Sequence, residues 1–267
     1  MRLRKALFVL PNLFTVSSIF CGFYALSLCE QVGRPDRFYQ AALAILFAVF
    51  FDTFDGRVAR LTKTQSEFGM HLDSLADVVS FGAAPALLLY RWALAPLGFW
   101  GLFISFVFAA CGALRLARFN VLANHHADPR FFVGLPIPLA AGAVLSLVIA
   151  RGATDASVPA VPVAAISLLL SYLMVSNVRY RTFKETRLTR RRTALLFLGA
   201  GAAVVAGVQF GPSTVLVAFI ASYILVGLLE QGVSSQRRRA ERRRVRATVA
   251  AGAPVEVEED EDEDDFV

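Results

Sequence analysis

Two pairs of aspartates are the residues whose types and spacing could do chemistry in this sequence. Asp52 and Asp55 are three positions apart, and Asp73 and Asp77 are four positions apart. On an α-helix either spacing places both carboxylates of a pair on one face. Each pair adjoins an apolar stretch, where a charged side chain is costly to bury, so we treat all four aspartates as candidate functional residues.

Neighbouring residues extend each pair into a longer helical stripe. The first stripe joins two acids to two small residues and an arginine: Asp52, Asp55, Gly56, Ala59 and Arg60. The second stripe is mainly acidic and small: Gly69, Asp73, Asp77, Ser80 and Ala84. If the two helices face each other, four carboxylates could not all stay ionised without cations, because like charges a few ångströms apart repel.

Divalent metal ions would resolve this conflict. Ligands that are all carboxylates, without an ordered set of Cys or His, favour Mg²⁺ or Mn²⁺ over zinc or copper. Paired ions of this kind recur in phosphoryl and phosphodiester chemistry, and Arg60 could bind a phosphate oxygen. The structural alternative is that the aspartates are interfacial carboxylates paired with Arg57, Arg60 and Lys63.

The elements that must position these residues are membrane helices. Of the 267 residues, 56% are hydrophobic and 18% charged, too few charges for an ordinary water-facing surface. We expect an all-α, polytopic integral membrane protein with about eight transmembrane helices, each about 20 residues long. The predicted spans are 7–29, 38–55, 74–92, 95–115, 132–150, 158–177, 193–210 and 213–230. Residues 1–232 would form the membrane domain.

The distribution of basic residues predicts the orientation. With eight spans, 23 Lys and Arg fall on the side of the N-terminus and only four on the other. By the positive-inside bias, both termini are then cytoplasmic, and both aspartate pairs lie at that face. Residues 233–267 form a tail that is first basic and then acidic, with an end that we expect to be disordered. In so hydrophobic a chain, the excess of basic over acidic residues favours membrane lipids, not nucleic acid, as the partner.

The spacing of the two stripes resembles the signature of the CDP-alcohol phosphatidyltransferase family. The pattern Asp52-x-x-Asp55-Gly56-x-x-Ala59-Arg60-x₈-Gly69-x₃-Asp73-x₃-Asp77 matches that signature at all eight fixed positions. The resemblance implies that Asp52, Asp55, Asp73 and Asp77 bind Mg²⁺ or Mn²⁺, with two ions expected. It also implies that Asp77 is the catalytic base that accepts the proton of an acceptor hydroxyl.

Further motifs resemble the bacterial phosphatidylserine synthase branch of that family. They are Pro11-Asn12-Leu-Phe-Thr15, Ser80-Phe81-Gly82-Ala-Ala-Pro85, Arg115-Leu-Ala-Arg118-Phe119-Asn120 and Gly134-Leu135-Pro136-Ile-Pro138. The resemblance then implies a CDP-diacylglycerol site made by Asn12, Thr15, Gly56, Ala59, Arg60, Gly69 and Ser80. For L-serine, the expected ligands are Arg115, Arg118 and Asn120, since an arginine suits a carboxylate. Positive-inside anchoring is the alternative role of the two arginines.

The resulting expectation is an enzyme of the inner cell membrane with a cytoplasmic active site. It would transfer a phosphatidyl group from CDP-diacylglycerol to L-serine and release CMP, and the resemblance also implies a homodimer. Glycerol 3-phosphate, inositol or choline remain alternative acceptors. A second alternative, an ion-coupled transporter, predicts acids spread through the bilayer, but the interiors of the other predicted spans carry none.

Overall fold

Long apolar helices make up most of the structure, a computed structural model that describes residues 2–31, 35–62, 64, 66–124, 131–151, 158–176 and 179–181. The helices of these residues are α1 (Arg2–Cys29), α2 (Pro35–Thr62), α3 (Glu67–Asp77), α4 (Ala84–Leu89), α5 (Phe99–Asn124), α6 (Ile137–Arg151) and α7 (Ala160–Val175). Two π-helical turns, η1 (Val78–Ala83) and η2 (Tyr90–Leu94), and a 3₁₀ turn, η3 (Ala95–Leu97), join α3, α4 and α5.

Three of the described segments are long and apolar enough to cross a membrane: Leu10–Cys29, Glu67–Leu97 and Phe99–Val121. Large apolar side chains such as Phe20 and Phe106 are exposed on these helices, as expected for a surface that faces lipid. The protein is therefore an integral membrane protein. The first six predicted spans overlap helices of the described residues, although 132–150 begins within the strand 131–133 and becomes helical only at Ile137. The predicted spans 193–210 and 213–230 and the tail 233–267 lie outside the described residues.

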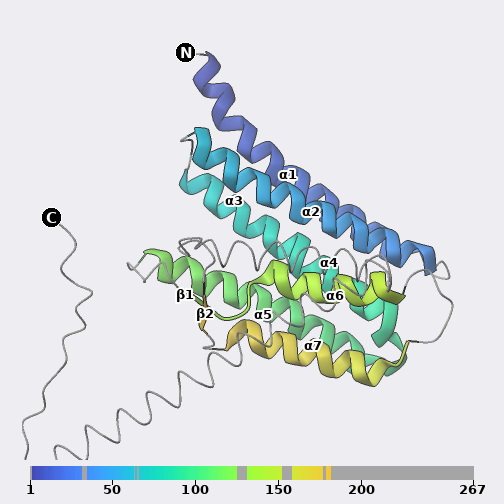
Figure 1. The fold of residues 1–267 in the computed structure, drawn as a ribbon. Helices are drawn as coiled ribbons and strands as arrows, with labels where there is room; N and C mark the ends of the chain where they lie inside the picture. The colour runs from blue at the N-terminus through green and yellow to red at the C-terminus, as the bar shows by residue number, and fades with distance from the viewer. Residues whose placement is uncertain are drawn as a thin grey trace, which may run out of the picture. The chain divides into compact units, whose positions relative to one another are not determined.

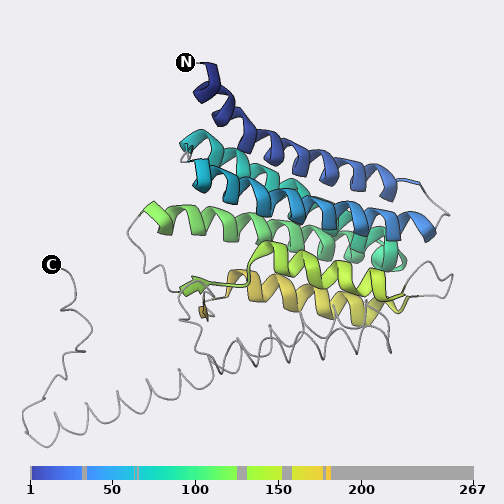
Figure 2. The same cartoon turned by 45° about the horizontal axis from the view of Figure 1, so that its top comes forward.

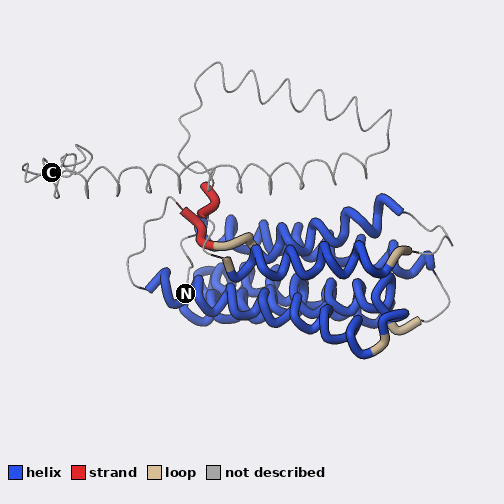
Figure 3. Tube along the Cα trace, turned by 90° about the horizontal axis from the view of Figure 1, so that it is seen from below, coloured by secondary structure: helices blue, strands red, loops and turns tan. Residues whose placement is uncertain are grey.

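The helices lie side by side along a common direction (Figure 1). One end of this arrangement gathers the beginning of α1, the connection between α2 and α3, and the end of α5 (Figure 2). The same end carries two short strands, β1 (Phe131–Val133) and β2 (Arg179–Arg181) (Figure 3). The topology thus brings the end of α2 and the beginning of α3 to one end, as the positions of the two aspartate pairs predict.

The two strands are the one departure from an all-α fold among the described residues. They pair antiparallel, with Phe132 opposite Tyr180. The pairing satisfies backbone groups of the segments that precede α6 and follow α7. Just after β1, Gly134 has φ +81°, and a Cβ there would collide with the carbonyl oxygen of Met174. Glycine is therefore needed where this segment turns against the end of α7.

A close approach joins α1 to η1 in the middle of the fold. A Cβ on Gly22 would lie 2.8 Å from Ser80 Oγ and 2.9 Å from Ser80 Cα. The Ser80 hydroxyl donates a hydrogen bond to the carbonyl oxygen of Ser18 over 2.9 Å. The absence of a side chain at Gly22 thus lets the two backbones pack closely, as small residues do between membrane helices.

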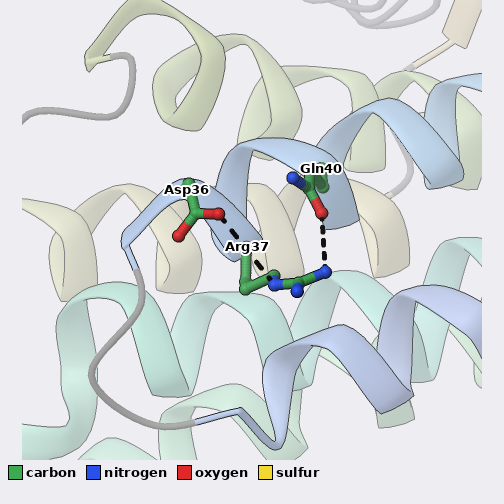
Figure 4. A network of polar contacts seen from close by, with 3 residues as sticks. All are labelled: Asp36, Arg37 and Gln40. Carbon is green, nitrogen blue, oxygen red and sulfur yellow. Dashed lines mark hydrogen bonds and ion pairs between the residues drawn. The ribbon is translucent and has the colours of Figure 1, made fainter.

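Charged residues also mark the opposite end of the helices, where α2 begins. Arg37 donates a hydrogen bond of 3.0 Å to Gln40 Oε1, and its Nε lies 4.0 Å from Asp36 Oδ2 (Figure 4). An ion pair of 3.7 Å joins Arg91 to Glu30 near the end of α1. These charges lie where α1 ends, where α2 begins and in η2, at the end of the helices opposite to the connection between α2 and α3 (Figure 1).

Candidate active site

Three carboxylates from two helices form the centre of the candidate site. Asp52 and Asp55 lie in the second half of α2, and Asp73 lies in α3. One carboxylate oxygen from each of the three lies within 4.8 Å of the others. This arrangement of hard oxygen ligands fits a divalent cation such as Mg²⁺ or Mn²⁺. The structure therefore brings together three of the four predicted metal ligands, as their helical spacing predicts.

The fourth aspartate, Asp77, is the last residue of α3. Its carboxyl lies near those of Asp52 and Asp73, whose negative charges act on it. Among the described residues, the buried Asp77 Oδ1 has no hydrogen-bond partner. A buried carboxylate oxygen without a protein partner indicates that something else interacts with it, and a cation or a substrate hydroxyl would serve. The position of Asp77 is thus compatible with both of its expected roles.

Local hydrogen bonds hold the connection between the two acidic helices. Ser66 is the N-cap of α3, and its hydroxyl accepts a 3.0 Å hydrogen bond from the backbone amide of Gly69. The hydroxyls of Thr62 and Thr64 lie 2.7 Å apart. Such a cap satisfies an amide that would otherwise lack a partner at the helix start. The short connection therefore gives α3 a defined beginning and fixes Asp73 nearly two turns into it.

A cavity of about 670 Å³ opens beside the three carboxylates. Its volume lies within the roughly 300–1,000 Å³ range of small-molecule sites. Predicted substrate-binding residues that line it are Asn12, Thr15, Gly56, Ala59, Arg60 and Gly69, next to Asp55 and Asp73. Other lining residues that the sequence analysis did not single out for binding are Pro11, Thr64, Ser66, Glu67, Met70 and Phe119. Pro11, Met70 and Phe119 are each next to a predicted site residue, and that proximity was the available signal. The other three belong to the connection between α2 and α3 and the start of α3, where the sequence carries no such signal.

Ser80 is the predicted substrate-binding residue that does not line this cavity. Its side chain is fully buried between η1 and α1, in contact with Ser18. The stripe that predicted its position assumed an uninterrupted α-helix after Asp77. Instead the chain enters a π-helical turn, whose i→i+5 hydrogen bonds widen the helix and change the direction of the side chains that follow.

The three predicted serine ligands near the end of α5 have different surroundings. Arg115 is 8% exposed, lies with its guanidinium 5.3 Å from the centre of the Phe119 ring, and interacts electrostatically with Asp77. Its Nε has no hydrogen-bond partner among the described residues. Arg118, by contrast, donates a 3.4 Å hydrogen bond to the carbonyl oxygen of Val175 at the end of α7.

Asn120 lies across from α3. Its Nδ2 donates a 2.9 Å hydrogen bond to Ser74 Oγ, and that hydroxyl donates in turn to the carbonyl oxygen of Met70. The contacts of Arg118 and Asn120 thus join α5 to α7 and to α3. Arg115 is the one of the three whose charge acts on Asp77.

The part of the chain that resembles known proteins contains the candidate site. Residues 8–175 match the family model of the CDP-alcohol phosphatidyltransferases. The chain is 37% identical over 230 residues to a CDP-diacylglycerol–serine O-phosphatidyltransferase of Helicobacter pylori, an alignment that covers 84% of this chain and 91% of the relative. A Bacillus subtilis protein of the same name is 35% identical over 177 residues, covering 66% of this chain and 92% of the relative. A Saccharomyces cerevisiae protein, also of that name, is 39% identical over 146 residues, about half of each chain.

Proposed function

The chain belongs to the CDP-alcohol phosphatidyltransferase family, and we propose that it transfers the phosphatidyl group of CDP-diacylglycerol to L-serine, giving phosphatidylserine and CMP. Similarity to CDP-diacylglycerol–serine O-phosphatidyltransferases over most of both chains supports serine as the acceptor. The observation that carries the proposal is the set of three aspartate carboxylates from α2 and α3 that line or adjoin a substrate-sized cavity. No comparable set is expected of an ion-coupled transporter, whose acids would be distributed along the spans.

Asp52, Asp55, Asp73 and Asp77 are proposed to hold two divalent ions, Mg²⁺ or Mn²⁺. The close approach of the carboxylate oxygens supports this assignment, since so many acids at one place need positive charge nearby. Bound ions would supply charge stabilisation for the phosphate oxygens of the substrate during transfer. The remaining chemistry belongs to residues of the chain.

Asp77 is proposed as the general base. It accepts the proton of the serine hydroxyl while the serine oxygen attacks the phosphorus on the lipid side of the pyrophosphate. A new phosphorus–oxygen bond forms to serine, the bond to the oxygen of the CMP leaving group breaks, and CMP departs with that electron pair. The buried Asp77 Oδ1, which has no partner among the described residues, is the atom that supports this role.

The donor substrate is proposed to occupy the cavity between α1, α2 and α3. Arg60 is exposed there, and its Nε already donates a 3.0 Å hydrogen bond to the carbonyl oxygen of Gly56. That bond holds the side chain along α2 and leaves the terminal amino groups of the guanidinium to bind a phosphate. A Cβ added to Gly56 would meet no atom within 4 Å, so this position leaves open space for the nucleotide.

The acceptor carboxylate is proposed to bind Arg115. This arginine is buried, interacts with the proposed base Asp77, and is held against Phe119, which lines the cavity. An arginine in these surroundings can bind a carboxylate and place the serine hydroxyl beside the base. Arg118 and Asn120 would support this arrangement indirectly, through their contacts with α7 and α3.

We also propose that the site faces the cytoplasm from the inner cell membrane, with both termini on the same side. The 23 to 4 distribution of basic residues supports this orientation. So does the gathering of the α2–α3 connection and the end of α5 at one end of the helices (Figure 2). A homodimer remains a prediction from family resemblance.

A direct assay tests the proposed reaction. Purified protein in mixed micelles with CDP-diacylglycerol and Mn²⁺ should release CMP when serine is added. Glycerol 3-phosphate, inositol and choline at equal concentration should release little. Equal rates with serine and glycerol 3-phosphate would refute serine as the acceptor and leave the family assignment intact. No CMP release with any of these alcohols would count against the transfer reaction itself.

A further inference from the structure

Thr15 makes a contact that its expected role in substrate binding does not require. Its hydroxyl lies 2.8 Å from Asp55 Oδ2 and 3.2 Å from the carbonyl oxygen of Pro11. Thr15 is 3% exposed and Asp55 is 6% exposed, so water has little access to the contact. The hydrogen bond therefore joins α1 to the acidic face of α2 in the interior of the protein.

The direction of this hydrogen bond follows from elementary chemistry. A threonine hydroxyl has one proton, and an ionised carboxylate only accepts hydrogen bonds. The carboxylate is also the stronger acceptor and lies at the shorter distance, so the proton goes to Asp55. One oxygen of Asp55 is thus held by α1, and the carboxyl group is less free to rotate.

We propose that Thr15 is a positioning residue for the cation site. It orients the Asp55 carboxylate before a cation binds, and it contributes to cation affinity more than to binding of the lipid nucleotide. This inference rests on the proposed metal-binding role of Asp52, Asp55 and Asp73, whose oxygens lie close enough together to share an ion. Groups that hydrogen-bond a metal ligand commonly change metal affinity by roughly 10–100-fold when they are removed.

The packing of α1 explains how a single hydroxyl can have this effect. Pro11, Thr15, Ser18 and Gly22 form a buried stripe along the helix. Ser18 and Gly22, which follow Thr15 by about one and two turns, pack tightly on Ser80 of η1. The position of α1 is therefore fixed by a second contact, so Thr15 holds Asp55 from a rigid support and not from a free helix.

Three variants separate positioning from general packing. Thr15→Val keeps the shape of the side chain and removes the donor, and Thr15→Ser restores the donor. Ser18→Ala is the matched control, because Ser18 is buried on the same stripe and its hydroxyl contacts Ser80, 3.4 Å away, and not an aspartate. Should Thr15→Val fail to give monodisperse protein, Thr15→Ala also lacks the donor and carries the same expectation.

Cation binding is measured without substrate, by electron paramagnetic resonance of free Mn²⁺ during titration of the detergent-purified protein. We expect Thr15→Val to raise the Kd for Mn²⁺ by roughly 10–100-fold. For Thr15→Ser and Ser18→Ala, the Kd should stay within about threefold of the parent value. At saturating Mn²⁺, the KM of Thr15→Val for CDP-diacylglycerol should rise by a smaller factor than its Kd for Mn²⁺ does.

A Thr15→Val protein that binds Mn²⁺ as the parent does would overturn the inference while leaving the proposed function in place. If the same variant also has a raised KM for CDP-diacylglycerol, Thr15 belongs to the substrate site instead. A parent protein that binds no Mn²⁺ at all would instead overturn the proposed cation site, and the role of Thr15 with it.

Discussion

Replacement of Asp77 by asparagine distinguishes a base from a metal ligand. The close group of carboxylate oxygens consists of Asp52, Asp55 and Asp73, whereas Asp77 lies outside that group and interacts electrostatically with Asp52, Asp73 and Arg115. Asparagine keeps the size of the side chain and one oxygen that can bind a cation, but it cannot accept the serine proton at neutral pH. If Asp77 is the base, the variant should bind both substrates and fail mainly in proton transfer.

The expected loss in turnover follows from that role. General-base catalysis contributes roughly 10²–10⁴-fold, which is about 2.7–5.4 kcal/mol of transition-state stabilisation. Loss of a metal ligand behaves differently, because the lower cation affinity is overcome by a higher cation concentration. Asp55→Asn is the matched control, since Asp55 belongs to the close group of oxygens. Some of its activity should return at high Mn²⁺.

The assay is CMP release at saturating serine over a series of Mn²⁺ concentrations. Asp77→Asn should stay slow over the whole series, while calorimetry shows that CDP-diacylglycerol still binds. The variant also removes a negative charge that interacts with the buried Arg115, so thermal unfolding in detergent is measured as a control for stability. Full turnover of Asp77→Asn at high Mn²⁺ would refute the assignment and leave Asp77 as a ligand only.

Three further predictions address the acceptor, the packing and the tail. Arg115→Gln should raise the KM for serine far more than the KM for CDP-diacylglycerol in steady-state assays. Arg118→Gln should raise the KM for serine less than Arg115→Gln does, and a larger rise with Arg118→Gln would assign the carboxylate site to Arg118. Gly22→Ala adds a Cβ that would lie 2.9 Å from the Cα of Ser80. Thermal unfolding in detergent should therefore show a free energy of unfolding lower by about 1–3 kcal/mol, and an unchanged midpoint would contradict the close packing. Deletion of 247–267 should leave micellar turnover near normal, because no proposed ligand lies there, and lost turnover would show that the acidic segment belongs to the active enzyme.

Much of the site could be predicted because it depends on local spacing. The positions of Asp52 and Asp55 on one helix and Asp73 on the next follow from the helical period, and the short connection between them makes the helices neighbours. Six of the eight predicted spans overlap helices for a similar reason, since long apolar stretches adopt helices in a membrane. Asn12, on a separate helix, came from resemblance to a family motif and not from spacing.

The rest depends on packing that no spacing reveals. The sequence after Asp77 reads as an ordinary helix, yet the contact of Ser80 with α1 accompanies a π-helical turn there. The arginines at the end of α5 have the same residue type and nearly the same position, and only tertiary contacts separate the buried Arg115 from Arg118. The two short strands form between segments almost fifty residues apart, without a sequence signal.

The π-helical turn after Asp77 also makes this stretch sensitive to its length. Its i→i+5 hydrogen bonds accommodate about one residue more than an α-helical turn does, so the loss of one residue between Val78 and Ala83 would let a regular α-helix continue with Pro85 and Leu88 still directed into the core. If the segment kept its full length and formed a regular α-helix, the extra residue would rotate Pro85 and Leu88 by about 100° relative to Asp73. The wide turn and the number of residues in 78–83 therefore belong together, and a change in one without the other puts the acidic helix out of phase with the helix that follows.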